Sequence, residues 1–234
     1  MTGAFKVLSL LLSYPTAELQ RSAGDMRAAL STEALLTERM HPGLYALIDQ
    51  LAARDLYDLQ ERYVFLFDRT RSLSLHLFEH VHGESRDRGQ ALVDLQALYE
   101  SHGLVVQARE LPDYLPLFLE FLATLPLDEA CGLLSQPLHV LTALHERLVK
   151  RRSDYAPVFT ALAALADGDA SDKDLAAARS ELDDDPDDLE ALDRAWEETA
   201  VTFGPETGPN DGCPKAEWMI QHMGAGTDVP APKA

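Results

Sequence analysis

Residues 63–95 read YVFLFDRTRSLSLHLFEHVHGESRDRGQALVDL. Within this stretch His76 and His80 are four positions apart, so their imidazoles share one face if the segment is helical. Glu79 lies between them, His82 follows closely, and aromatic and guanidinium side chains complete the mixture. A helix that only fills a core does not need this combination. We therefore expect the stretch to hold the functional residues and the rest of the chain to position it.

The chain on either side shows the 3.6-residue spacing of apolar side chains that is typical of amphipathic helices. This spacing predicts helices over residues 5–12, 44–51, 56–67, 92–99, 115–125, 138–148 and 158–165. Residues 72–77 alternate polar and apolar as a strand would, but no partner strand is evident, so we expect irregular chain leading into a short helix. The sequence thus predicts an all-α fold, with one helical-bundle domain over residues 1–200.

The composition changes near Thr202, after which proline and glycine are frequent and apolar periodicity is lost. Such a segment cannot bury enough apolar surface to offset the entropy of an ordered chain. Residues 201–234 are therefore predicted to form a flexible C-terminal tail that is dispensable for folding.

The charge balance limits the partners that the protein can have. The 234 residues carry 39 acidic and 20 basic side chains, a formal net charge of −19. A nucleic-acid-binding face would need the opposite charge, so we expect no nucleic-acid partner. No run approaches the roughly 20 apolar residues of a membrane span, so we expect no membrane protein. With only two cysteines, a reducing, cytoplasmic location is the simpler interpretation.

The residues His76-Leu-Phe-Glu-His80 fit the H-x-x-E-H pattern of inverted zinc peptidases. In a helical zinc hydrolase of this kind His76 and His80 would bind the metal, and Glu79 would activate a water molecule. Two observations weigh against this alternative. A third ligand is not obvious, and no sheet is predicted for the motif helix to pack against. We expect no bound metal and no catalytic residue.

The same cluster has two further interpretations, and the residues alone do not choose between them. Imidazole, carboxylate and guanidinium groups beside aromatic surface can bind a peptide helix. Alternatively, the charged side chains Glu84, Arg86, Asp87 and Arg88 pair with Asp68 and Arg69 and tie two helices together.

The central run resembles the nitrate reductase delta-subunit family, the NarJ-type molybdenum cofactor assembly chaperones. The matching residues are Phe67-Asp-Arg69, Ser74-Leu75, Leu77 to Ala91, Tyr99-Glu100, His102 to Leu104, Arg109 to Asp113, Leu115 to Leu117 and Ala195 to Glu198. The resemblance covers roughly residues 1–200. Tyr114 stands where many relatives have the histidine of an E-x-P-D-H motif, so no imidazole role is transferred to it.

The resemblance implies an all-helical fold of the molybdoenzyme-chaperone (TorD-like) type. It implies a chaperone that binds the N-terminal segment of the apo catalytic (alpha) subunit of respiratory nitrate reductase. The chaperone would assist insertion of a molybdenum–bis-pterin cofactor into that client without binding a cofactor itself, and a homodimer is left open. We expect an apolar groove with acidic rim groups and with Tyr114 and Phe118 as exposed aromatics. The candidate client-binding residues are Phe67, Asp68, His76, Phe78, Glu79, His80, His82, Glu84, Arg86, Arg88, Glu110, Pro112, Asp113, Tyr114 and Phe118.

Overall fold

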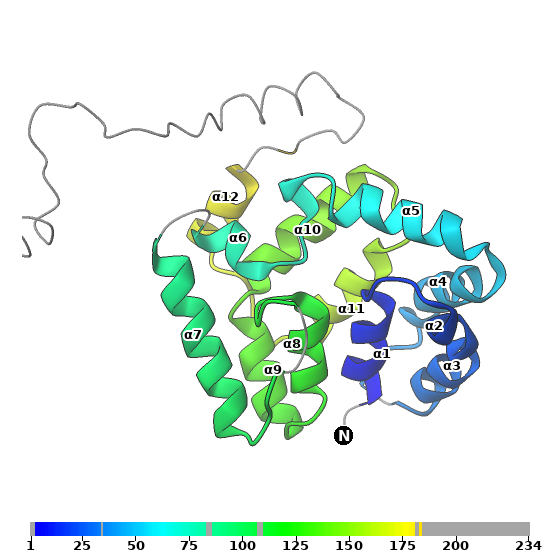
Figure 1. The fold of residues 1–234 in the computed structure, drawn as a ribbon, viewed down its shortest axis with the longest axis horizontal. Helices are drawn as coiled ribbons and strands as arrows, with labels where there is room; N and C mark the ends of the chain where they lie inside the picture. The colour runs from blue at the N-terminus through cyan, green and yellow to red at the C-terminus, as the bar shows by residue number, and fades with distance from the viewer. Residues whose placement is uncertain (1–2, 34, 83–85, 107–109, 181–182, 184–234) are drawn as a thin grey trace, which may run out of the picture. The chain divides into compact units, whose positions relative to one another are not determined.

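A computed structural model of the protein describes residues 3–33, 35–82, 86–106, 110–180 and 183. The helices, shown in Figure 1, are α1 (Gly3–Leu11), α2 (Ala17–Arg21), α3 (Ala23–Thr32), α4 (His41–Ala53), α5 (Leu56–Phe67), the 3₁₀ helix η1 (Arg71–Leu73), α6 (Leu77–His82), α7 (Arg86–Ser101), α8 (Leu115–Leu122), α9 (Leu127–Ser135), α10 (Leu138–Lys150), α11 (Ala156–Leu165) and α12 (Asp172–Ser180). No strand occurs within the described ranges, and one isolated antiparallel bridge joins His76 to Tyr114. The all-α fold class is confirmed.

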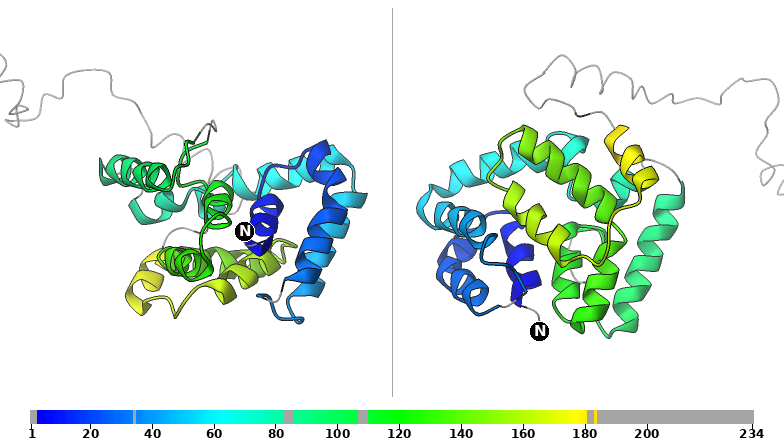
Figure 2. Two further views of the ribbon diagram at one scale, coloured as in Figure 1. Left: turned by 90° about the horizontal axis from the view of Figure 1, so that it is seen from below. Right: turned by 180° about the vertical axis from the view of Figure 1, so that it is seen from behind.

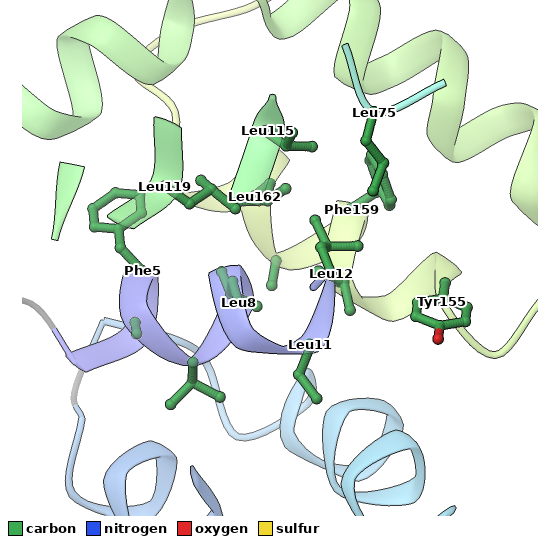
Figure 3. Packing of buried hydrophobic residues seen from close by; sticks show 14 of the residues in the cluster. Phe5, Leu8, Leu11, Leu12, Leu75, Leu115, Leu119, Tyr155, Phe159 and Leu162 are labelled. Carbon is green, nitrogen blue, oxygen red and sulfur yellow. The ribbon is translucent and has the colours of Figure 1, made fainter. Parts of the chain in front are cut away.

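Helix α1 lies at the centre of the apolar core and packs against α3, α8 and α11. Viewed from below in Figure 2, it lies between the green α8 and the blue helices that follow it in the chain. Figure 3 shows Phe5 and Leu8 of α1, and Leu12 just after it, pointing toward α8 and α11, whereas Leu11 points to the opposite side. Because α1 is apolar around most of its circumference, it is buried on several sides rather than on one stripe. Its buried Ser9 hydroxyl donates a hydrogen bond of 2.7 Å to the Pro116 carbonyl at the start of α8.

The helix ends follow from local sequence chemistry. The Thr16 hydroxyl accepts the Leu19 N–H at the start of α2, and the Asp55 carboxylate accepts the Tyr57 N–H at the start of α5. Helix α8 ends at Leu122, so the predicted end at Leu125 is wrong. Beyond this end the Thr124 and Leu125 N–H groups make i→i−3 hydrogen bonds, and Pro126 disfavours helical backbone at Leu125 before it.

Helix α10 holds the segment between α5 and α6 through hydrogen bonds of Arg147. The buried Arg147 side chain donates hydrogen bonds of 2.8 Å to the carbonyl oxygens of Ser72 in η1 and of Ala178 in α12. The expectation of irregular chain leading into a short helix is confirmed here, because η1 and α6 occupy residues 71–73 and 77–82. Arg147 therefore holds the first half of the central run against the body of the protein.

Two expectations lie outside the described residues: the domain boundary near residue 200 and the flexible tail over residues 201–234. None of the helices described is both long enough and apolar enough to span a membrane.

Candidate functional site

Asp113 connects two parts of the chain that are far apart in sequence. Its side chain is fully buried. One carboxylate oxygen lies 3.2 Å from His76 Nδ1, and the other accepts the Phe78 N–H at 3.1 Å. The Asp113 backbone carbonyl accepts the Leu77 N–H, and the Leu115 N–H donates to the Leu75 carbonyl at 2.8 Å. Asp113 thus caps the first turn of α6 from another segment and fixes the start of α8 beside it.

The two histidines of the H-x-x-E-H pattern do not converge on one point. His76 Nδ1 faces the Asp113 carboxylate, whereas His80 Nε2 lies 2.9 Å from the Ser74 carbonyl oxygen. Within the part of the chain that the structure describes, no three His, Cys, Asp or Glu side chains are grouped to hold a metal ion. The zinc hydrolase alternative gains no support from this geometry.

A cavity of about 160 Å³ lies where the C-terminal end of α5 meets the segment before α8, and we call it the tyrosine cavity. Its lining residues are Tyr14, Tyr63, Phe67, Asp68, Leu75, His76, Glu110 and Tyr114. The structure therefore brings together five of the fifteen candidates from the sequence, which come from two distant segments. Tyr14 and Tyr63 were not among the candidates.

The tyrosine rings are held by hydrogen bonds and ring contacts. The Tyr63 hydroxyl donates to the Leu12 carbonyl at 2.8 Å and lies 2.7 Å from the Tyr114 hydroxyl. The Tyr14 ring meets the Tyr63 ring edge to face at a centroid distance of 5.6 Å. Burial raises the pKa of Tyr114 to about 12 and also raises the pKa of Tyr63, so both hydroxyls stay protonated at neutral pH.

Asp68 and Glu110 give the tyrosine cavity its negative charge. Partial burial raises the pKa of Asp68, and the charge of Glu110 raises it further, while His76 acts in the opposite sense. The two carboxylates therefore repel each other in a recess that is partly shielded from water.

A shallower hollow of about 460 Å³ continues along the outer face of α5, and we call it the α5 hollow. Its lining residues are Tyr14, Tyr57, Gln60, Glu61, Val64, Phe65 and Arg69. Tyr57 and Val64 are 79% and 42% exposed, although both are large and apolar. Tyr14 borders both recesses, so the tyrosine cavity and the α5 hollow adjoin.

The spacing of Tyr57 and Val64 along the sequence indicates the α5 hollow, whereas their apolar character alone does not. Tyr57 and Val64 are seven positions apart, which places them on one helix face with Glu61 between them. Asp58 and Glu61 on the same side of α5 are exposed, and Gln60 and Arg62 are partly exposed. Apolar side chains on the same helix face as exposed polar residues are expected to be exposed as well. This reasoning identifies Tyr57 and Val64 as exposed apolar residues.

The remaining candidates have other positions. Phe118 is only 5% exposed and packs in the core, so the expectation that it is an exposed groove aromatic is wrong. Phe67 is also buried, although it contributes to the cavity wall. The Pro112 carbonyl accepts a hydrogen bond of 2.7 Å from the Tyr99 hydroxyl. Phe78 is partly buried against the core. Both residues therefore contact the body of the protein and do not line the tyrosine cavity.

The alternative of a charge network between residues 84–88 and the pair Asp68 and Arg69 can be compared with the structure only for the side chains that it describes. Arg88 lies 3.1 Å from Glu79 within the α6–α7 region, and the Arg69 guanidinium lies over the Phe65 ring. Arg88 therefore contacts Glu79 rather than Asp68, and Arg69 contacts an aromatic ring. Glu84 and the side chains of His82 and Arg86 lie outside the described residues.

We expect His76 to make the stability of the protein depend on pH. Its hydrogen bond to Asp113 raises the pKa of His76 above the usual value, although burial opposes this. The stabilising contribution is complete below the unfolded-state pKa of about 6.5 and disappears as the pH rises through the higher folded-state pKa. Urea unfolding at a series of pH values should therefore show stability falling over this range, with a smaller fall in His76→Gln. His102 is present in both proteins, so its own titration cancels in the difference. Equal slopes for parent and variant would show that the pair does not form.

The fold and the recesses define an all-helical protein with an aromatic and acidic recess at one surface. Comparison with known proteins then places it: the chain belongs to the family described as nitrate reductase delta subunit, whose model matches residues 22–161. It is 44% identical over 207 residues to the nitrate reductase molybdenum cofactor assembly chaperone NarJ of Escherichia coli K12, covering 88% of this chain and 87% of that protein.

Two further relatives have similar names. The chain is 42% identical over 199 residues to the probable nitrate reductase molybdenum cofactor assembly chaperone NarW of E. coli K12, covering 85% of this chain and 82% of that one. It is 32% identical over 160 residues to the probable chaperone NarJ of Bacillus subtilis, covering 68% and 86% respectively. The family expected from the central run is confirmed.

Proposed function

We propose that the protein is a cytoplasmic chaperone for the assembly of a respiratory nitrate reductase. It binds the N-terminal segment of the apo catalytic (alpha) subunit and keeps that client competent for insertion of the molybdenum cofactor and for complex assembly. The observation that carries the proposal is the 44% identity with a nitrate reductase molybdenum cofactor assembly chaperone over 88% of this chain. The cofactor is cargo for the client, and the chaperone acts by binding rather than by catalysis.

The α5 hollow is the part of the surface best suited to take an apolar face of the client. Tyr57 and Val64 are exposed there at a spacing that matches two turns of a helix, and Tyr14 closes one end. Burying exposed apolar side chains on a partner gives most of the binding free energy at such surfaces, and aromatic residues are frequent anchors. An amphipathic client helix lying along α5 would cover both side chains.

Apart from Arg69 in the α5 hollow and His76 in the tyrosine cavity, the charged groups that line the two recesses are carboxylates, which suit a client segment that carries basic residues. Glu61 borders the α5 hollow, and Asp68 and Glu110 border the tyrosine cavity. A formal net charge of −19 would also accelerate the approach of a basic segment at low salt. The client-binding site proposed here therefore keeps Asp68, His76, Glu110 and Tyr114 and gives Asp113 a supporting role.

The proposal is tested by titrating the purified protein against overlapping peptides that cover the candidate client. We expect binding to be confined to peptides from the N-terminal segment and to weaken with salt, because the charged contacts are screened. A peptide of the same composition in scrambled order is the matched control. Equal binding of the scrambled peptide, or binding confined to another part of the client, would contradict the proposal.

A further inference from the structure

The walls of the tyrosine cavity are largely aromatic. Hydrogen bonds to Leu12 and Tyr114 fix the Tyr63 hydroxyl, and the edge-to-face contact fixes Tyr14 against it. The His76 ring lies 5.4 Å from the Tyr114 ring at an interplanar angle of 36°. At about 160 Å³ the cavity is far larger than the roughly 15 Å³ that one water molecule requires. It is large enough for a small planar group.

The carboxylates of the tyrosine cavity have no lysine or arginine partner among the described residues, and His76 is the one wall residue that attracts them when it is protonated. Neither Asp68 nor Glu110 makes an ion pair there, and no lysine or arginine lines the cavity. Two arginines of the neighbouring chain have other partners: Arg62 pairs with Asp154, and Arg69 lies over Phe65 beside the α5 hollow. The mutual repulsion that contributes to the raised pKa of Asp68 would be relieved by a cation placed between the two carboxylates.

We propose that the tyrosine cavity binds one guanidinium group, supplied by an arginine side chain of the client. This inference rests on the proposed function for the identity of the partner. A guanidinium group is flat and weakly hydrated, stacks on aromatic rings, and has five N–H donors that reach two carboxylates at once. An ammonium group is compact and more strongly hydrated, so it gains less from the tyrosine walls. The cavity therefore distinguishes arginine from lysine, and the α5 hollow holds the apolar face of the same segment.

Small probes test the cavity without the client. The full-length protein is titrated with n-propylguanidinium, with n-butylammonium and with neutral n-propylurea, while the tyrosine ring signals are followed by NMR. We expect the guanidinium probe to bind best, the ammonium probe more weakly, and the urea probe, which has nearly the same shape, to leave the signals unchanged. Asp68→Asn and Glu110→Gln should each weaken guanidinium binding about threefold, and the double variant about tenfold, as is typical of partly exposed ion pairs.

Glu38→Gln is the matched control, because it removes one exposed carboxylate outside both recesses. It should bind the guanidinium probe as the parent does. Full affinity in the Asp68→Asn/Glu110→Gln variant, or equal binding of the urea probe, would overturn the inference. A parent protein that binds the N-terminal client peptide but not the guanidinium probe would overturn the cavity assignment alone. One that binds the probe but no client peptide would overturn the proposed function and leave the cavity assignment standing.

Discussion

Asp113→Ala is expected to lower the free energy of unfolding by about 3 kcal/mol, because it removes a buried hydrogen-bonding partner. The buried carboxylate accepts the Phe78 N–H and faces His76 Nδ1, so its removal leaves both groups without an acceptor or counter-charge. The cap of α6 is lost at the same time, although caps alone contribute only about 1 kcal/mol. Urea unfolding followed by circular dichroism measures the difference.

Asp113→Asn separates the hydrogen bonds from the charge. Its amide oxygen can still accept the Phe78 N–H and its amide nitrogen can donate to His76, so we expect roughly half the loss of the alanine variant. Glu38→Ala, at an exposed position, is the control for removing a carboxylate and should leave stability nearly unchanged. If Asp113→Ala unfolds at the urea concentration of the parent, the connection between α6 and the start of α8 does not depend on this side chain.

The helical class could be predicted from the sequence because its signal is local. Apolar spacing of 3.6 residues is set within one or two turns, and the apolar face predicted from Leu56 to Phe67 lies on a helix, α5. The pairing of Asp113 with His76 was not predictable in this way, because it joins positions 37 residues apart. Residues 110–113 and the central run were both included among the client-binding candidates, but only the tertiary fold shows which of their atoms meet.

The prediction that Phe118 is exposed is wrong for a specific physical reason. Helix α8 has the sequence LPLFLEFL, which is apolar on nearly every side, so periodicity does not indicate which face is outward. The structure places Phe118 inward, and Leu117 is only partly buried. Tyr57 and Val64 were missed for the opposite reason, because large apolar residues are usually assigned to a core and these two are exposed.

The second large effect is expected in client binding and comes from the α5 hollow. Val64 is 42% exposed on the outer face of α5, so a substitution there leaves the core intact. Val64→Lys would place a hydrated ammonium group where the client's apolar face is expected and would repel its basic residues. Losing such a contact typically costs about 2 kcal/mol, or about 30-fold in the dissociation constant. Val93→Lys is the matched control, since Val93 is 59% exposed on α7 and lines neither recess.

The most direct test of the account is calorimetric titration of the client's N-terminal peptide against the parent, Val64→Lys and Val93→Lys proteins, each shown by circular dichroism to be folded. The account predicts that Val64→Lys weakens binding by about 30-fold and that Val93→Lys binds within about twofold of the parent. A Val64→Lys protein that binds the peptide as tightly as the parent would contradict the placement of the client on α5.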